Sequence, residues 1–208
     1  VFLLSQTSTM MDIEDTVYGS VPLFVMSSLL GCVLIVGIFF RSLLLAIRSI
    51  VSIAFTLSIV YMLAIGIFQM DALAGTGIPL GGSSGLFFMV PVMTFTINVG
   101  LALDYDIFLL TRIVELRERS GGSLSTEEAT AMGLVQTGPI INCAGLIMTV
   151  AFGGMIFSDV PSMKQTAFLF MVAVLLDTFC VRTVVTPALT AALGEANWWP
   201  RQFKPRNH

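Results

Sequence analysis

Three adjacent residues, Asp104, Tyr105 and Asp106, could carry proton chemistry. They interrupt an apolar segment that ends at Arg112, the first basic residue after more than sixty without one. A charged side chain at the centre of a membrane helix costs about 2.5–3.5 kcal/mol on insertion scales, so such residues usually have a function. We therefore predict that Asp104 binds and releases a proton, with Tyr105 as its hydrogen-bond partner.

Helical geometry separates the two acids. Asp104 precedes Arg112 by eight residues, and at 1.5 Å per residue this places it about 12 Å from the helix end, near mid-bilayer. Gly100, one turn away, leaves room for another backbone or a water molecule. Asp106 lies about 200° around the helix from Asp104, so one helix cannot aim both acids at one site. We expect four apolar residues to bury Asp104: Ile97, Leu101, Ile107 and Phe108.

Another acid and a base interrupt the last apolar segment. Asp177 and Arg182 are five residues apart, about 140° around an α-helix, so we expect each to pair with a different helix. The candidate partners are Asn98, Tyr105 and Asn142. We predict that Asp177 is a second relay residue. For Asp106 a relay role and a structural role both stay open. Arg182 either pairs with a buried group or extends to the membrane surface.

Composition identifies the class of protein. Of 208 residues, 56% are hydrophobic and 11% charged, whereas soluble domains are about 25% charged. This predicts a polytopic membrane protein. A net charge of −3 with scattered basic residues indicates no nucleic-acid surface. Cys32, Cys143 and Cys180 lack metal-ligand spacing and are interpreted as small buried hydrophobes. The single histidine is His208, the last residue. We expect no metal and no cofactor.

Apolar runs, the third and fifth of them interrupted by the charged residues above, predict an all-α bundle of five membrane-spanning helices. They are expected at 21–40, 49–68, 86–110, 139–157 and 164–192. Arg41 and Arg48 are expected to bracket the first loop. Ser125 and Glu128 fit a capping box, which predicts a surface helix near 126–135.

The two ends of the chain are predicted to lie outside the bilayer. Residues 1–20 are polar and acidic and are interpreted as the end of a water-exposed region. Residues 195–208 are predicted to form a tail in which Trp198-Trp199-Pro200 is an interfacial aromatic anchor. The predicted topology places eight of the ten basic residues on one side of the membrane, which predicts a cytoplasmic C-terminus and residues 1–20 outside. These eight are Arg41, Arg48, Arg112, Arg117, Arg119, Arg201, Lys204 and Arg206.

Several segments resemble one transporter family. The segment from Gly100 to Arg112 resembles the Gly-Leu-x-x-Asp-Tyr-x-x-Phe-Leu-x-x-Arg pattern of the mycobacterial-membrane-protein-large family, which belongs to the resistance–nodulation–division (RND) transporters. The resemblance covers nearly the whole chain. Its other parts are Phe39-Phe-Arg-Ser42, Glu128-Ala129, Thr137-Gly138-Pro139, Asp177-x4-Arg182-x4-Pro187-Ala-Leu189, Leu193-Gly194 and Asn197-Trp-Trp-Pro200.

The resemblance implies helices eight to twelve of a twelve-helix pump that exports lipids or other hydrophobic molecules and is driven by proton entry. It also implies that Asp104 and Tyr105 face a second Asp-Tyr pair in an N-terminal half. The implied partners are membrane lipids, a lipid or other hydrophobic cargo and that half, with homo-oligomers left open. The implied porter domain would precede residues 21–194 and end within 1–20.

Two alternatives remain from the sequence. One is a non-transporting, sterol-sensing-like scaffold with the same helices. The other is an intramembrane aspartyl protease, for which the chain offers Tyr105-Asp106, Asp177 and Pro187-Ala-Leu189. The protease is the weaker alternative, because Asp177 follows two leucines rather than the glycines of that motif.

Overall fold

The computed structural model describes residues 6–70, 85–121 and 123–200 and confirms an all-α bundle. Its five long helices are apolar and long enough to cross a membrane, and no strand occurs in these residues. The helices are α1 (Gln6–Phe40), α2 (Leu43–Phe68), α3 (Met89–Arg119), α4 (Thr126–Gly153) and a composite fifth helix. The fifth joins α5 (Pro161–Leu175), the π-helix η2 (Leu176–Val185), α6 (Thr186–Leu193) and the 3-10 helix η3 (Gly194–Trp198). A further 3-10 helix, η1 (Gly154–Phe157), extends α4.

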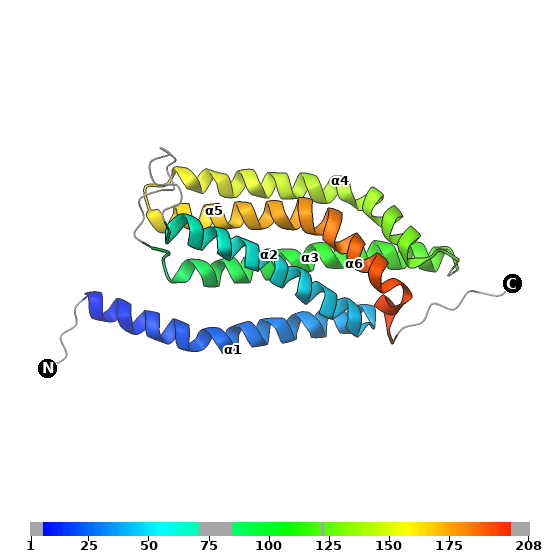
Figure 1. Cartoon of the computed structure of the whole chain (residues 1–208), viewed down its shortest axis with the longest axis horizontal. Coiled ribbons are helices and arrows are strands. Elements are labelled where there is room, and N and C mark those ends of the chain that lie inside the picture. Colours follow the sequence, from blue (N-terminus) through cyan, green and yellow to red (C-terminus); the bar gives the residue numbers. More distant parts are fainter. Residues whose placement is uncertain (1–5, 71–84, 122, 201–208) are drawn as a thin grey trace.

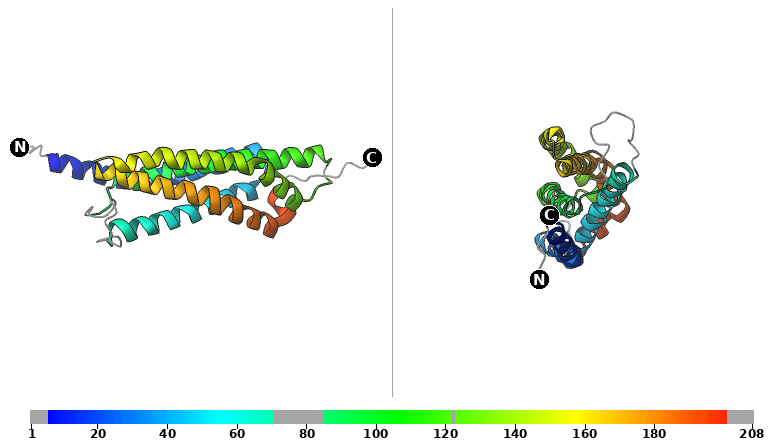
Figure 2. Two further views of the ribbon diagram at one scale, coloured as in Figure 1. Left: turned by 90° about the horizontal axis from the view of Figure 1, so that it is seen from above. Right: turned by 90° about the vertical axis from the view of Figure 1, so that its left-hand side faces the viewer.

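The helices run side by side along the long axis of the molecule (Figure 1). Seen end-on, α1 lies at one edge and α4 at the other, with α2, α3 and the fifth helix between them (Figure 2). Helix α3 packs against α1, α2, α4 and α5. Any polar residue on α3 therefore either faces one of these neighbours or points out of the bundle.

Helix α4 begins where the capping box predicts. Glu128 N donates to Ser125 Oγ at 3.2 Å, and Ser125 N donates to Glu128 Oε2 at 3.0 Å, which satisfies two amides of the first turn. The surface helix expected at 126–135 is not separate, because α4 continues from Thr126 to Gly153 with Pro139 inside it. Figure 1 shows α4 bending along its length, as a helix does where proline removes a backbone donor.

Arg48 differs from its predicted place. It does not end a loop but lies inside α2 with 5% of its surface exposed. The helix continues through this charge because a guanidinium N–H of Arg48 donates to the hydroxyl of Thr190 on α6. Uncharged runs therefore underestimate the helix, which starts at Leu43.

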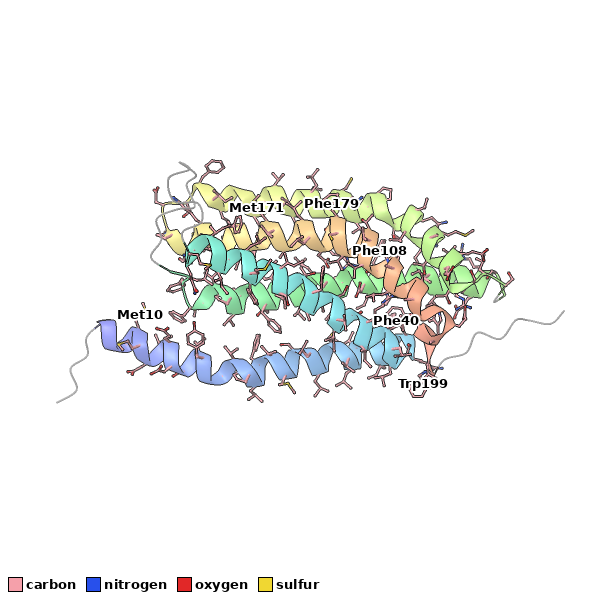
Figure 3. The ribbon with its side chains drawn as sticks, in the orientation of Figure 1. Met10, Phe40, Phe108, Met171, Phe179 and Trp199 are labelled. Carbon is pink, nitrogen blue, oxygen red and sulfur yellow. The ribbon has the colours of Figure 1, made fainter. Side chains whose placement is uncertain are left out.

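Of the two adjacent tryptophans near the C-terminus, one is buried in the core and one is exposed. Trp199 is exposed and points away from the bundle (Figure 3). Trp198 is buried in the cluster that contains Phe40 and Leu109, so the prediction of a shared interfacial anchor is wrong for it. Its indole N–H donates to Thr126 Oγ1 at 3.0 Å. A buried partner therefore satisfies the indole and fixes η3 against the start of α4.

The cysteines differ from one another as well. Cys32 is buried in the core as predicted, but Cys143 is exposed and Cys180 is partly exposed. The latter two lie on outward faces of α4 and η2, where an apolar residue can face lipid rather than protein.

Candidate proton-relay site

Helix α3 points its three central polar side chains in different directions. Asp104 is exposed, Tyr105 is half-buried and Asp106 is only 6% exposed. The rotation of about 100° per residue places Asp104 and Asp106 on nearly opposite sides of the helix. The structure therefore separates the two acids as predicted, but the buried acid is Asp106 and not Asp104.

Asp104 lies at a cavity between α3 and α4. The cavity has a volume of about 690 Å³ and extends along one face of α3 from Asp104 to Glu115. Ile107 and Phe108, which were expected to bury the carboxylate, instead line this space with it. Gly100, one turn away, is also exposed, and nothing lies within 4 Å of a β-carbon built on it. This face of α3 is therefore open in the five-helix bundle.

Asp106 and Asp177 meet at a shared cation. Arg182 Nη1 donates to Asp106 Oδ1 at 3.0 Å, and Arg182 Nε donates to Asp177 Oδ2 at 3.0 Å. Arg182 Nη2 donates to the carbonyl oxygen of Ala102 at 2.9 Å. All three residues are at most 6% exposed. We call Asp106, Asp177 and Arg182 the buried ion cluster.

The prediction that Asp177 and Arg182 do not pair within their helix is wrong. They lie in η2, a π-helix of ten residues. A π-helix bonds residue i to residue i+5, so side chains five apart stack along the helix instead of diverging by 140°. The spacing of this pair matches that bonding pattern. Nothing in the residue types of Leu176–Val185 predicts the π-helix itself.

Tyr105 contacts two neighbouring helices, through its ring and through its hydroxyl. Its ring lies beneath the guanidinium of Arg182, with 4.9 Å from Cζ to the ring centroid. Its hydroxyl donates to Met148 Sδ on α4 at 3.5 Å rather than to Asp104. Tyr105 is therefore a partner of Arg182, as predicted, while its predicted bond to Asp104 is replaced by a weak bond to sulfur.

Two residues predicted to support the site, Asn98 and Asn142, lie in different surroundings. Asn98 is 3% exposed, and its Nδ2 has no partner among the described residues. Asn142 lies on α4 beside a second cavity that Arg182 also lines. Sequence reasoning missed Arg48 as a second buried cation. Ser52 and Thr56 follow Arg48 at intervals of four residues on the same helical face. This polar stripe in a largely apolar segment is the signal that could have identified it.

The geometry does not match a protease dyad. Two catalytic aspartates share one proton because like charges a few ångströms apart cannot both ionise. Here a guanidinium donates to both carboxylates. One guanidinium offsets one of the two negative charges and places a cation where a dyad would hold a proton.

Comparison with known protein families gives a match: the model of the MMPL family matches residues 1–207. The chain belongs to the MMPL family. Members of this family are transporters and not enzymes. With five helices able to cross a membrane, this MMPL protein is a multi-pass membrane protein.

Three relatives illustrate the match. A putative membrane protein of Streptomyces coelicolor, SCO6666, is 30% identical over 210 residues, covering 100% of this chain. The trehalose monomycolate exporter MmpL3 of Mycolicibacterium smegmatis is 32% identical and covers 98% of this chain. The exporter of mycolic acid-containing lipids MmpL11, from the same organism, is 34% identical and covers 93%. The chain spans 29%, 20% and 20% of their respective lengths.

Proposed function

We propose that this chain is the helix bundle that forms part of a proton-driven exporter of lipids or other hydrophobic molecules. The observation that carries the proposal is Asp104, a carboxylic acid on the open face of a helix long enough to span a membrane. A carboxylate facing hydrocarbon is costly, so this face requires protein or water against it. In an MMPL transporter an N-terminal half carrying a second Asp-Tyr pair would supply that cover.

In this proposal Asp104 accepts a proton from outside and releases it to the cytoplasm. Each proton that crosses releases about 2.3 kcal/mol per 100 mV and about 1.4 kcal/mol per unit of pH gradient. One proton can therefore bias two conformations of the bundle by about one to two powers of ten. Protonation removes the charge from the open face of α3, which lets that face pack differently against its cover.

Asp177 is the second relay residue, and the other members of the buried ion cluster support it. Arg182 keeps two acids inside the bundle by donating to both. Asp106 on α3 accepts a hydrogen bond from Arg182. A change in the charge of Asp177 therefore acts through Arg182 on α3, the helix that carries Asp104. Asn98, Gly100 and Asn142 are proposed to admit water or a neighbouring helix.

The topology is part of the same proposal. Residues 21–194 make up the transmembrane helix bundle with its connections, 1–20 lie outside the membrane and 195–208 lie on the cytoplasmic side. Length supports this, because α1 has 35 residues, about 52 Å at 1.5 Å per residue, against a hydrocarbon core of about 30 Å. Helix α1 therefore extends beyond the bilayer, toward the region where the porter domain of the transporter is expected.

The test is export of an established lipid cargo by the full-length protein in membrane vesicles, with and without an imposed proton gradient. Asp104→Asn keeps the shape and removes the titration, so gradient-stimulated export should fall to background. Asp159→Asn, in the exposed turn between α4 and α5, is the matched control and should export normally. Wild-type, gradient-stimulated export by Asp104→Asn would end the relay assignment. No export by the wild-type protein under either condition would favour the scaffold alternative, and export that never responds to the gradient would refute proton coupling.

A further inference from the structure

A second cavity reaches the buried ion cluster from the side opposite Asp104. It lies between α4 and η2, has a volume of about 580 Å³ and is lined by Arg182 together with Asn142, Thr178 and Thr183. It shares no lining residue with the cavity at Asp104. The guanidinium that holds Asp106 and Asp177 therefore borders an open space separate from the one at Asp104.

The local backbone explains why this space exists. Gly145 lets α4 approach η2 so closely that a β-carbon there would lie 2.5 Å from Thr178 Oγ1. Toward the N-terminal part of α4, Pro139 interrupts the helix and lines the cavity. Because proline has no N–H, the carbonyl of Val135, which also lines the cavity, loses its α-helical donor. The two helices thus touch at one point and separate beside it.

The cavity walls present polar groups that need partners. Thr178 is 1% exposed, and its Oγ1 has no hydrogen-bond partner among the described residues. Asn142 and Thr183 add donors and acceptors around the same space, which Val135 also lines. A buried polar group without a partner costs about 1–3 kcal/mol. Water occupies a cavity when it has more than about 10–15 Å³ of accessible volume and two to four polar partners, and both conditions are met here.

We propose that water fills the cavity between α4 and η2 and gives the buried ion cluster an aqueous access of its own. The water lies against Thr178, binds Asn142 and extends to the guanidinium of Arg182. The charged groups around Arg182 are Asp106 on α3, Asp177 on η2 and the buried Arg48 on α2, and the titratable Tyr105 on α3 lies against it. The functional meaning rests on the proposed proton relay, because water at the cluster lets Asp177 exchange a proton without passing Asp104.

Cysteine labelling in the full-length protein tests the water without relying on transport. Thr183 and Val184 are neighbours, both exposed, but only Thr183 lines the cavity. In a variant with Cys32, Cys143 and Cys180 replaced by alanine, Thr183→Cys and the matched control Val184→Cys are treated with a charged methanethiosulfonate. Because only a thiolate reacts and thiolates form in water, Thr183→Cys should react at least about tenfold faster. Adding Asn142→Leu should slow that reaction, since it removes a polar wall.

Equal rates at the two cysteines overturn the proposal. If both are unreactive, lipid or packed side chains fill the space; if both react, water reaches this level of η2 irrespective of the cavity. Transport is measured in parallel with Asp104→Asn. Fast labelling at Thr183→Cys in a protein whose export ignores the proton gradient would refute the proposed function while keeping the hydrated cavity.

Discussion

The two faces of α3 contrast although their acids are two residues apart. On one face, Asp106 is held by Arg182 and, through it, by Asp177. On the other, Asp104 borders an open cavity with Thr111, Arg112 and Gln136. Arg112 Nε donates to Gln136 Oε1 at 2.6 Å, so α3 and α4 are joined at the Arg112 end of this cavity.

The contrast shows that one helix carries one acid bound to a buried cation and one acid on an open face. An acid fixed by a buried cation is strongly tied to the fold, because removing its partner leaves an uncompensated charge. An acid on an open face can gain or lose a proton with little effect on the bundle that carries it. The predictions below compare the two faces in order of expected effect.

The largest effect on stability is expected from Arg182→Leu. It leaves Asp106 and Asp177 buried without their cation, and breaking a buried ion pair costs about 3–5 kcal/mol. The measurement is SDS-induced unfolding of the purified full-length protein in mixed micelles, with Asp104→Asn expected to unfold like the wild type. Combining Arg182→Leu with Asp106→Asn and Asp177→Asn should restore most of the loss. A wild-type midpoint for Arg182→Leu would remove the distinction between the two faces.

A smaller loss of stability is expected from a substitution at the contact between η2 and α4. Gly145→Ala places a β-carbon 2.5 Å from Thr178 Oγ1 and 2.8 Å from its Cγ2, so we expect a loss of about 1–3 kcal/mol from overpacking. The same unfolding assay applies. Thr178→Ala removes both atoms and should rescue the variant.

Gly153→Ala is the matched control in the same helix. Its added β-carbon would meet only Met171, at 3.4 Å from Sδ, which is ordinary contact with a flexible side chain. We expect no loss of stability. Equal losses at both glycines would show that α4 tolerates no β-carbon in general, and the close contact with Thr178 would lose its significance.

The sequence predicted the helices well because burial in a membrane leaves long uncharged runs. It placed Asp104 and Asp106 on different sides of α3 because helical rotation is fixed. Prediction from the sequence failed where a polar side chain donates a hydrogen bond to another helix. Arg48 was assigned to a loop and Trp198 to an interface, although Thr190 and Thr126, far away in the sequence, satisfy their donors.

The prediction that Asp177 and Arg182 do not pair within their helix was wrong for a different reason. It depends on a local change from α- to π-helix, for which the residues of η2 carry no distinctive signal. Exposure of Asp104 was missed because apolar neighbours in one helix say nothing about whether another helix covers them.

Tyr105→Phe should have the smallest effect, and it tests where the boundary between the two faces lies. The ring remains beneath Arg182, and the lost bond is one hydroxyl donating to a sulfur, a weak acceptor. We expect a stability change within about 0.5 kcal/mol, the range of substitutions that break no buried network, and export reduced less than in Asp104→Asn. Tyr105→Leu removes the ring as well and should lose up to about 2 kcal/mol of cation–π stabilisation. If Tyr105→Phe instead stops gradient-driven export as completely as Asp104→Asn, the hydroxyl belongs to the proton path, and Tyr105 must be assigned to the open face.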